Sequence, residues 1–139
     1  MTQVNFNLDH IGLAATSPNL LREWYTTVLN TTEVWRSPEV EAYLLRLPGG
    51  SLIEIYPATT RSTPEVAAIN GVAGWRHLAL RVPNLETAIQ HLDQHNVSWR
   101  SDIRPAGGGG RVRFFSDPEG NLWHLVERSN PDQIQLPAL

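Results

Sequence analysis

The 139-residue sequence contains no cysteine, which excludes disulfide bonds, thiolate nucleophiles and cysteine-based zinc sites. Basic residues number 11 against 14 acidic ones, and the resulting formal net charge of −3 argues against a nucleic-acid partner. No apolar run approaches the ~20 residues needed to cross a bilayer. The polar residues 1–8 also lack the apolar segment of a signal peptide. We therefore expect a cytoplasmic protein without membrane or nucleic-acid partners, in which any metal is held by histidine, carboxylate or backbone oxygen.

What is present is enough apolar material for one packed domain over residues 1–139, with 41% hydrophobic and 18% charged residues. Three landmarks recur in the same order at nearly one offset, which indicates duplication of one unit. They are His10 and His77, 67 positions apart, residues 18–20 and 83–85, 65 apart, and residues 50–54 and 120–124, 70 apart.

Hydrophobic periodicity predicts one helix and four strands in each copy. In module one, about 6–57, the strands are 6–15, 33–36, 41–47 and 51–56, with a helix over 18–29. In module two, about 75–127, the strands are 75–82, 97–100, 111–115 and 121–127, with a helix from residue 83 to 92. Residues 58–74 form a linker and 128–139 a tail. We thus predict an α+β fold of two βαβββ modules whose sheets form a half-open, eight-stranded, barrel-like cup. By default the five tryptophans are assigned mostly to the core.

Each module carries two residues that suit a metal ion. A histidine lies on the first strand and a ligand-type residue lies four positions after a turn glycine on the last strand. These residues are His10 and Glu54 in module one, and His77 and His124 in module two. Because side chains alternate along a strand, the apolar neighbours Ile11 and Leu78 face the helices and both histidines face the cup. Small residues beside the histidines leave room for a ligand.

Such a set suits Zn, Ni, Fe, Mn or Co, and a metal held there can polarise a carbonyl or acidify bound water. We predict a metal-dependent enzyme acting on a small molecule. Glu127 is an alternative fourth ligand, which would need a bulge to reach the same face as His77. Arg81 shares the face of His77 and could receive an anionic substrate. His91 and His95 have a zinc-compatible spacing on the second helix, although a solvated helix face explains them more simply.

The sequence resembles the vicinal-oxygen-chelate superfamily, which includes glyoxalase I, extradiol dioxygenases and bleomycin-binding proteins. The segments that carry the resemblance are residues 9–13, 24–25, 47–54, 74–82 and 117–124. The resemblance implies paired βαβββ modules with metal ligands on the first and last strand of each, here His10, Glu54, His77 and His124. At residue 124 the family usually has Glu, which in glyoxalase I-like enzymes is also the proton-shuttling base. Here Glu54 or His124 would have to move the proton.

Three functions follow from the resemblance. The first is a glyoxalase-like lyase or isomerase that chelates a substrate oxyanion, with Glu54 and His124 as catalytic residues. With only one carboxylate among the four ligands the site charge would be about +1, which favours an anionic substrate. The second function is an Fe(II) extradiol-type dioxygenase, and the third is a binding or resistance protein without catalysis. We also expect a homodimer, because an open cup of strands has edges to cover.

Overall fold

The computed structural model describes residues 2–61 and 69–135, so part of the expected linker, 62–68, and the end of the tail, 136–139, lie outside the described residues. The chain divides into two compact units, Met1–Arg61 and Ser62–Leu139, with the boundary inside the expected linker. Each unit is one copy of the predicted repeat. None of the helices in the described ranges has the length and apolar character needed to cross a membrane.

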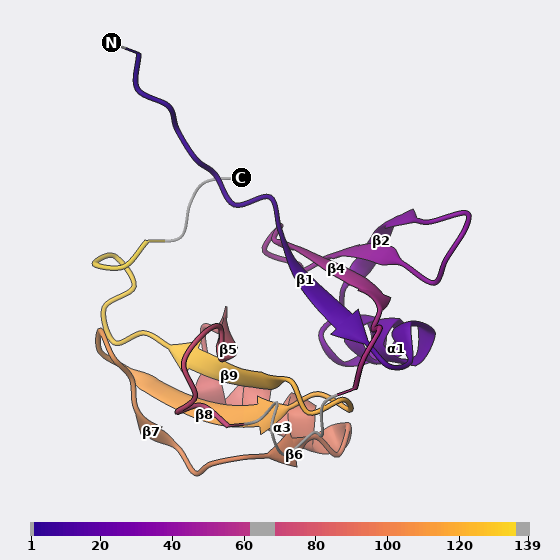
Figure 1. Ribbon diagram of the computed structural model, residues 1–139. Helices are drawn as coiled ribbons and strands as arrows, with labels where there is room; N and C mark the ends of the chain where they lie inside the picture. The colour runs from indigo at the N-terminus through magenta and orange to yellow at the C-terminus, as the bar shows by residue number, and fades with distance from the viewer. Residues whose placement is uncertain (1, 62–68, 136–139) are drawn as a thin grey trace. The chain divides into compact units, whose positions relative to one another are not determined.

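The first unit is a βαβββ module (Figure 1). Its elements are β1 (His10–Ala15), α1 (Pro18–Val28), β2 (Thr32–Arg36), β3 (Tyr43–Arg46) and β4 (Leu52–Pro57). They form a four-stranded sheet in the order β1-β4-β3-β2, in which β1 and β4 are parallel and the other pairs antiparallel. The predicted first strand was too long at its start, because residues 6–9 precede β1 and lie outside any strand.

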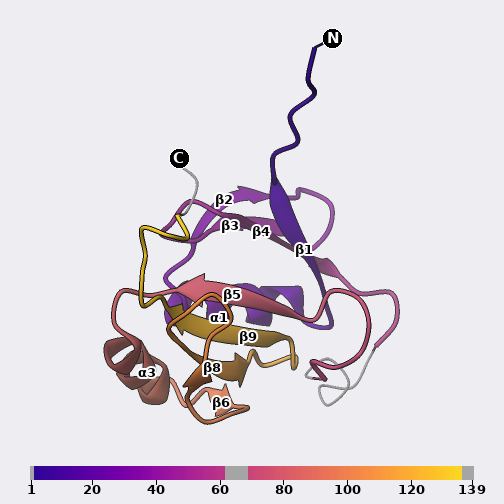
Figure 2. The same ribbon diagram turned by 90° about the vertical axis from the view of Figure 1, so that its left-hand side faces the viewer.

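The second unit repeats this order and adds a strand. Its elements are β5 (His77–Arg81), α3 (Leu85–Gln94), β6 (Ser98–Trp99), β7 (Arg104–Pro105), β8 (Arg111–Ser116) and β9 (Leu122–Glu127). The sheet runs β5-β9-β8-β6, again with the first two strands parallel, and β8 lies between β9 and β6 (Figure 2). The prediction of paired βαβββ modules is confirmed, and the two-residue β7, which pairs with β8, is a small addition to it.

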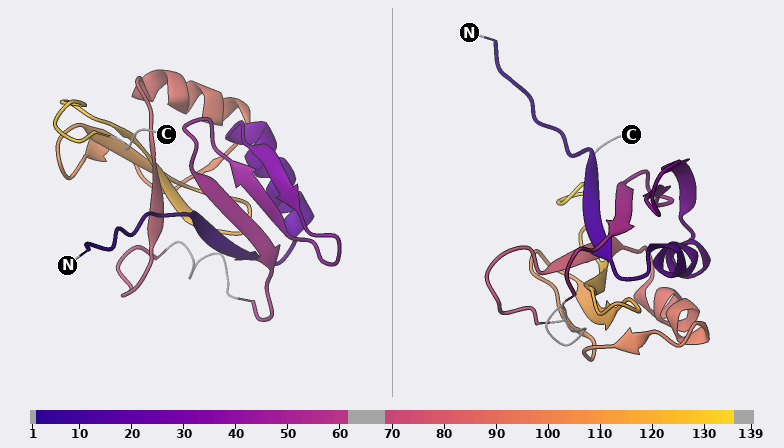
Figure 3. Two further views of the ribbon diagram at one scale, coloured as in Figure 1. Left: turned by 90° about the horizontal axis from the view of Figure 1, so that it is seen from above. Right: turned by 45° about the vertical axis from the view of Figure 1, so that its right-hand side comes forward.

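In each unit the helix covers one face of its own sheet (Figure 3), and this packing fixes which face carries the polar residues. Leu21 and Tyr25 of α1 are at most 1% exposed, as are Ile53 and Ile55 of β4, so the odd-numbered residues of β4 face the helix. In the second unit the helix-facing core includes Leu85, Leu92, Phe115, Trp123 and Leu125. The alternation inferred from the sequence is therefore observed, and it leaves His10, Glu54, His77 and His124 on the faces away from the helices.

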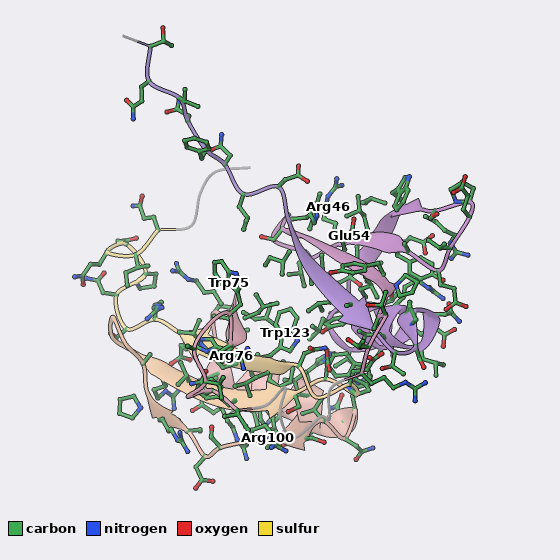
Figure 4. The ribbon with its side chains drawn as sticks, in the orientation of Figure 1. Arg46, Glu54, Trp75, Arg76, Arg100 and Trp123 are labelled. Atoms are coloured by element: carbon green, nitrogen blue, oxygen red, sulfur yellow. The ribbon has the colours of Figure 1, made fainter. Side chains whose placement is uncertain are left out.

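Only one of the five tryptophans is fully buried, so the default assignment of tryptophans to the core was mostly wrong. Trp123 is 1% exposed, whereas Trp35 is 46% and Trp75 is 99% exposed. Trp75 lies on the segment that leads into β5 (Figure 4).

Candidate functional site

His10 and Glu54 lie beside each other in the first unit. His10 Nε2 is 4.0 Å from Glu54 Oε2, and both side chains are about one-third exposed. The parallel pairing of β1 with β4 sets this contact, because Leu52 is the partner of His10 and Glu54 follows it on the same face. The other ring nitrogen, Nδ1, donates to Asp9 Oδ2 at 2.7 Å. This hydrogen bond is the main reason that the pKa of His10 is raised.

His77 and His124 form the corresponding pair in the second unit, with ring centroids 4.9 Å apart. Phe114 completes a triangle of rings, since its centroid is 5.4 Å from that of His77 and 4.8 Å from that of His124. The sheet register explains the cluster, because Ala79 of β5 and Phe114 of β8 are both Cα partners of His124. His124 is only 8% exposed. Burial in this setting lowers the pKa of His124, and so favours the neutral imidazole that binds a metal.

The three histidines share one hydrogen-bond pattern. His77 Nδ1 lies 2.8 Å from Asn70 Oδ1, and His124 Nδ1 lies 3.1 Å from the carbonyl oxygen of Leu125. Together with the Asp9 contact of His10, each Nδ1 therefore faces an oxygen that can only accept, so Nδ1 is the protonated nitrogen. Each Nε2 then presents a lone pair. Metal-binding histidines usually donate their second ring nitrogen to such an acceptor, so these donors fit a divalent metal.

The structure brings together the two predicted ligands of each module. Within residues 2–61 and 69–135, no three His, Asp or Glu side chains form a group that could hold a metal ion. The pairs His10–Glu54 and His77–His124 are thus observed, and the combined set of four ligands stays a prediction.

Glu127, the alternative fourth ligand, has a different set of partners. Its carboxylate accepts a hydrogen bond from the backbone N–H of Leu85 at 2.8 Å, at the start of α3. It also accepts from Arg111 at 2.9 Å, and Arg111 in turn pairs with Glu86. The pairing of β8 with β9 is continuous from residue 122 to 127, without the bulge that would redirect Glu127. The side chain therefore anchors α3 to the sheet, on the helix side.

The partners of Glu127 make a testable contribution to acid stability. The pKa of Glu127 is lowered by the N–H of Leu85 and by Arg111, and the pKa of Glu86 is lowered by Arg111. A carboxyl whose pKa is depressed on folding stabilises the protein above its unfolded-state pKa of about 4.5, and this contribution is lost as pH falls through the folded-state value. In urea titrations between pH 7 and pH 3.5, Glu127→Gln should lose stability at pH 7 and show a flatter pH dependence. Glu41→Gln, at an exposed loop position, should follow the wild type; parallel curves for Glu127→Gln and wild type would contradict this role.

The remaining candidates differ in what surrounds them. Arg81 ends β5 on the face of His77, and among the described residues its guanidinium has no hydrogen bond or ion pair, so it is available to an anion. His91 of α3 and His95, which caps the C-terminus of that helix, have ring centroids 4.9 Å apart, and no third ligand-type residue in the described ranges joins them.

Four residues of the two sites were missed by sequence reasoning. Asp9 and Asn70 orient histidines, Phe114 contacts both histidines of the second pair, and the ring of Tyr56 lies against Gly12 at the first. Asp9 adjoins His10 and could have been noticed as an acceptor. The others depend on loop conformation or strand register, which no short sequence pattern specifies. Gly12 was expected to leave empty room, and part of that room is filled by Tyr56.

Comparisons with known proteins match this chain to one family and to proteins of similar fold. The family model described as Glyoxalase/Bleomycin resistance protein/Dioxygenase superfamily matches residues 7–125. The uncharacterized protein YaeR of Escherichia coli (strain K12) is 30% identical over 130 residues, which cover 87% of this chain and 95% of that protein. Among solved structures, the fosfomycin resistance protein FosX from Listeria monocytogenes is similar, with a TM-score of 0.73 and 17% identity over 94% of this chain and 98% of that chain.

Two further structures are similar in fold. A FosX variant complexed with Mn(II) and 1S,2S-dihydroxypropylphosphonic acid has a TM-score of 0.72 and 16% identity, and the match covers 94% of this chain and 98% of that one. A glyoxylase/bleomycin resistance protein/dioxygenase domain from Frankia sp. EAN1pec has a TM-score of 0.71 and 17% identity, covering 91% of this chain and 95% of that one.

Proposed function

Because the chain belongs to the glyoxalase/bleomycin resistance protein/dioxygenase superfamily, we propose that it is a divalent-metal enzyme of the lyase or isomerase type. The proposed ligands are His10, Glu54, His77 and His124. The observation that carries the proposal is the shared pattern of the three histidines, each with Nδ1 on an oxygen acceptor, which leaves Nε2 as the nitrogen to bind a metal. The two pairs could meet within one chain or between two copies in the homodimer that we also propose.

The proposed substrate is small, rich in oxygen and anionic. Three neutral imidazoles and one carboxylate leave a divalent ion with a site charge of about +1, which attracts an anion. Arg81, on the face of His77, would add to this attraction. FosX, whose fold is similar, has been crystallised with Mn(II) and a dihydroxypropylphosphonic acid, a ligand of this general kind.

A bound divalent metal would supply Lewis-acid stabilisation of negative charge developing on a substrate oxygen. Glu54 is the one carboxylate of the proposed set, so its Oε atoms are the natural acceptor for a substrate proton. His124, whose Nδ1 proton is held by the Leu125 carbonyl, is the second candidate, acting through Nε2. Phe114 packs against the rings of His77 and His124.

The direct test is metal content followed by substrate screening. The purified full chain should retain a transition metal by elemental analysis, and removal of the metal by a chelator should abolish turnover of the substrate it is found to use. Methylglyoxal with glutathione tests glyoxalase activity. Oxygen uptake with catechols by an iron-containing preparation would instead support the dioxygenase alternative. A chain that neither retains nor binds divalent metals would contradict the proposal.

Asn70 offers a test of the hydrogen-bond pattern itself. Asn70→Ala removes the acceptor of His77 Nδ1, so the imidazole loses its fixed tautomer and orientation. We expect metal affinity to fall about 10- to 100-fold, the usual effect of losing such a partner, in titrations followed by calorimetry. Asn5→Ala, in the exposed N-terminal segment, is the matched control. Unchanged affinity for Asn70→Ala would show that Asn70 does not orient a metal ligand.

A further inference from the structure

Tyr56 lies on the same face of β4 as Glu54, two residues further along. It is 38% exposed, and among the described residues its hydroxyl has no hydrogen-bond partner. Glu54 and Tyr56 alternate with the fully buried Ile53 and Ile55, so both project to the side of the sheet away from α1. A phenol left free beside a candidate metal ligand is available to a bound molecule.

The ring of Tyr56 leans toward the His10–Glu54 pair. By register Tyr56 is the Cα partner of Ala14, and Gly12 is the partner of Glu54. A Cβ built at Gly12 would nevertheless be 3.3 Å from Tyr56 Cε1 and 3.9 Å from its hydroxyl oxygen. The side chain of Tyr56 therefore leans from its own register position back over Gly12, which is the Cα partner of Glu54. A larger residue at position 12 would push the ring away.

We infer that the Tyr56 hydroxyl donates a hydrogen bond to an oxygen of the small anionic ligand bound at the His10–Glu54 pair, an inference that rests on the proposed function. A phenol is a donor at neutral pH, and a hydrogen bond to a charged acceptor is among the stronger kinds. The ring lies against Gly12, the register partner of Glu54, so the hydroxyl is on the face of the sheet that carries the His10–Glu54 pair. Gly12 is then a positioning residue, since the absence of its side chain sets the place of the ring.

The experiment uses the metal-loaded full chain and oxalate as an anionic probe with two adjacent oxygens. Tyr56→Phe removes only the hydroxyl, and we expect oxalate affinity in calorimetry to fall about tenfold, while metal affinity measured beforehand stays within about twofold. Gly12→Ala keeps the hydroxyl but places a methyl group 3.3 Å from Tyr56 Cε1, so the ring must shift slightly, and it should weaken oxalate binding in the same direction but less than Tyr56→Phe. Tyr43→Phe is the matched control, because Tyr43 lies on the helix-facing side of the same sheet and its hydroxyl contacts Asn19.

The outcomes separate the two proposals. If all variants bind the metal but wild type and Tyr56→Phe bind oxalate equally well, the role of Tyr56 is overturned. The same holds if neither binds oxalate. In both cases the metal proposal still stands. Failure of the wild type to bind any divalent metal would overturn both. Should Gly12→Ala fail to fold by circular dichroism, Tyr56→Phe alone decides, since it removes a single partly exposed oxygen atom and leaves the backbone unchanged.

Discussion

Replacement of His124 by alanine should abolish the retention of a divalent metal. His124 is the most buried of the proposed ligands, at 8% exposure, and burial already favours its neutral, metal-binding form. Its Nδ1 donates a hydrogen bond to the Leu125 carbonyl oxygen, so Nε2 is the metal-binding atom that the substitution removes. With one of four ligands removed, we expect affinity for Mn(II) or Zn(II) to fall by at least about 100-fold. Elemental analysis and calorimetric titration at pH 7.5 measure this directly.

Two companion variants sharpen this prediction. His124→Glu installs the residue more usual at this place in the resembling family, so it should keep the metal but lower the site charge from about +1 to about zero and weaken anion binding. His91→Ala, on the surface of α3, removes a histidine outside the proposed set and should leave metal content unchanged. Full metal retention by His124→Ala would exclude His124 as a ligand.

Gly110→Ala should destabilise the fold strongly. Gly110 has φ of 104°, a conformation that residues with a Cβ rarely adopt. A Cβ at this position would lie 1.9 Å from the carbonyl oxygen of Glu127 and 2.9 Å from the Cα of Arg128, so the backbone itself would have to move. We expect a loss of about 3 kcal/mol or more in the free energy of unfolding, measured by urea denaturation.

A control for this variant lies in the same loop. Gly107 has no atom within 4 Å of its built Cβ and no positive φ, so Gly107→Ala should change stability by less than about 1 kcal/mol. The loop contains four consecutive glycines, residues 107–110. It is a turn closed by the bond from Ala106 N to Gly110 O and held by Arg128, which donates to the carbonyl oxygen of Gly107. Similar stability for both alanine variants would show that the contact with Glu127 is unimportant.

Much of the fold followed from local patterns. The repeat landmarks at 10 and 77 and at 54 and 124 predicted two modules, and alternation along β1 and β5 correctly separated the helix-facing residues from the ligand face. Local patterns were less informative at element ends and for large exposed residues. Residues 6–9 alternate like a strand but do not form one. Trp75 is exposed, although a large aromatic side chain is expected in the core. The hydrophobic pattern of the sequence shows which side chains could be buried. Whether they are buried depends on whether another helix or strand covers the face on which they lie.

By itself, then, the sequence determined which side chains share a face and which residue types could hold a metal, because strand alternation and ligand chemistry are local properties. The tertiary structure decided which atoms meet. Parallel pairing of β1 with β4 and of β5 with β9 brings Glu54 to His10 and His124 to His77. Only the fold could show that Glu127 is engaged by Leu85 and Arg111, or that Tyr56 leans over Gly12. Those contacts join residues far apart in the chain, and strand register, which is set by packing of the whole sheet, determines them.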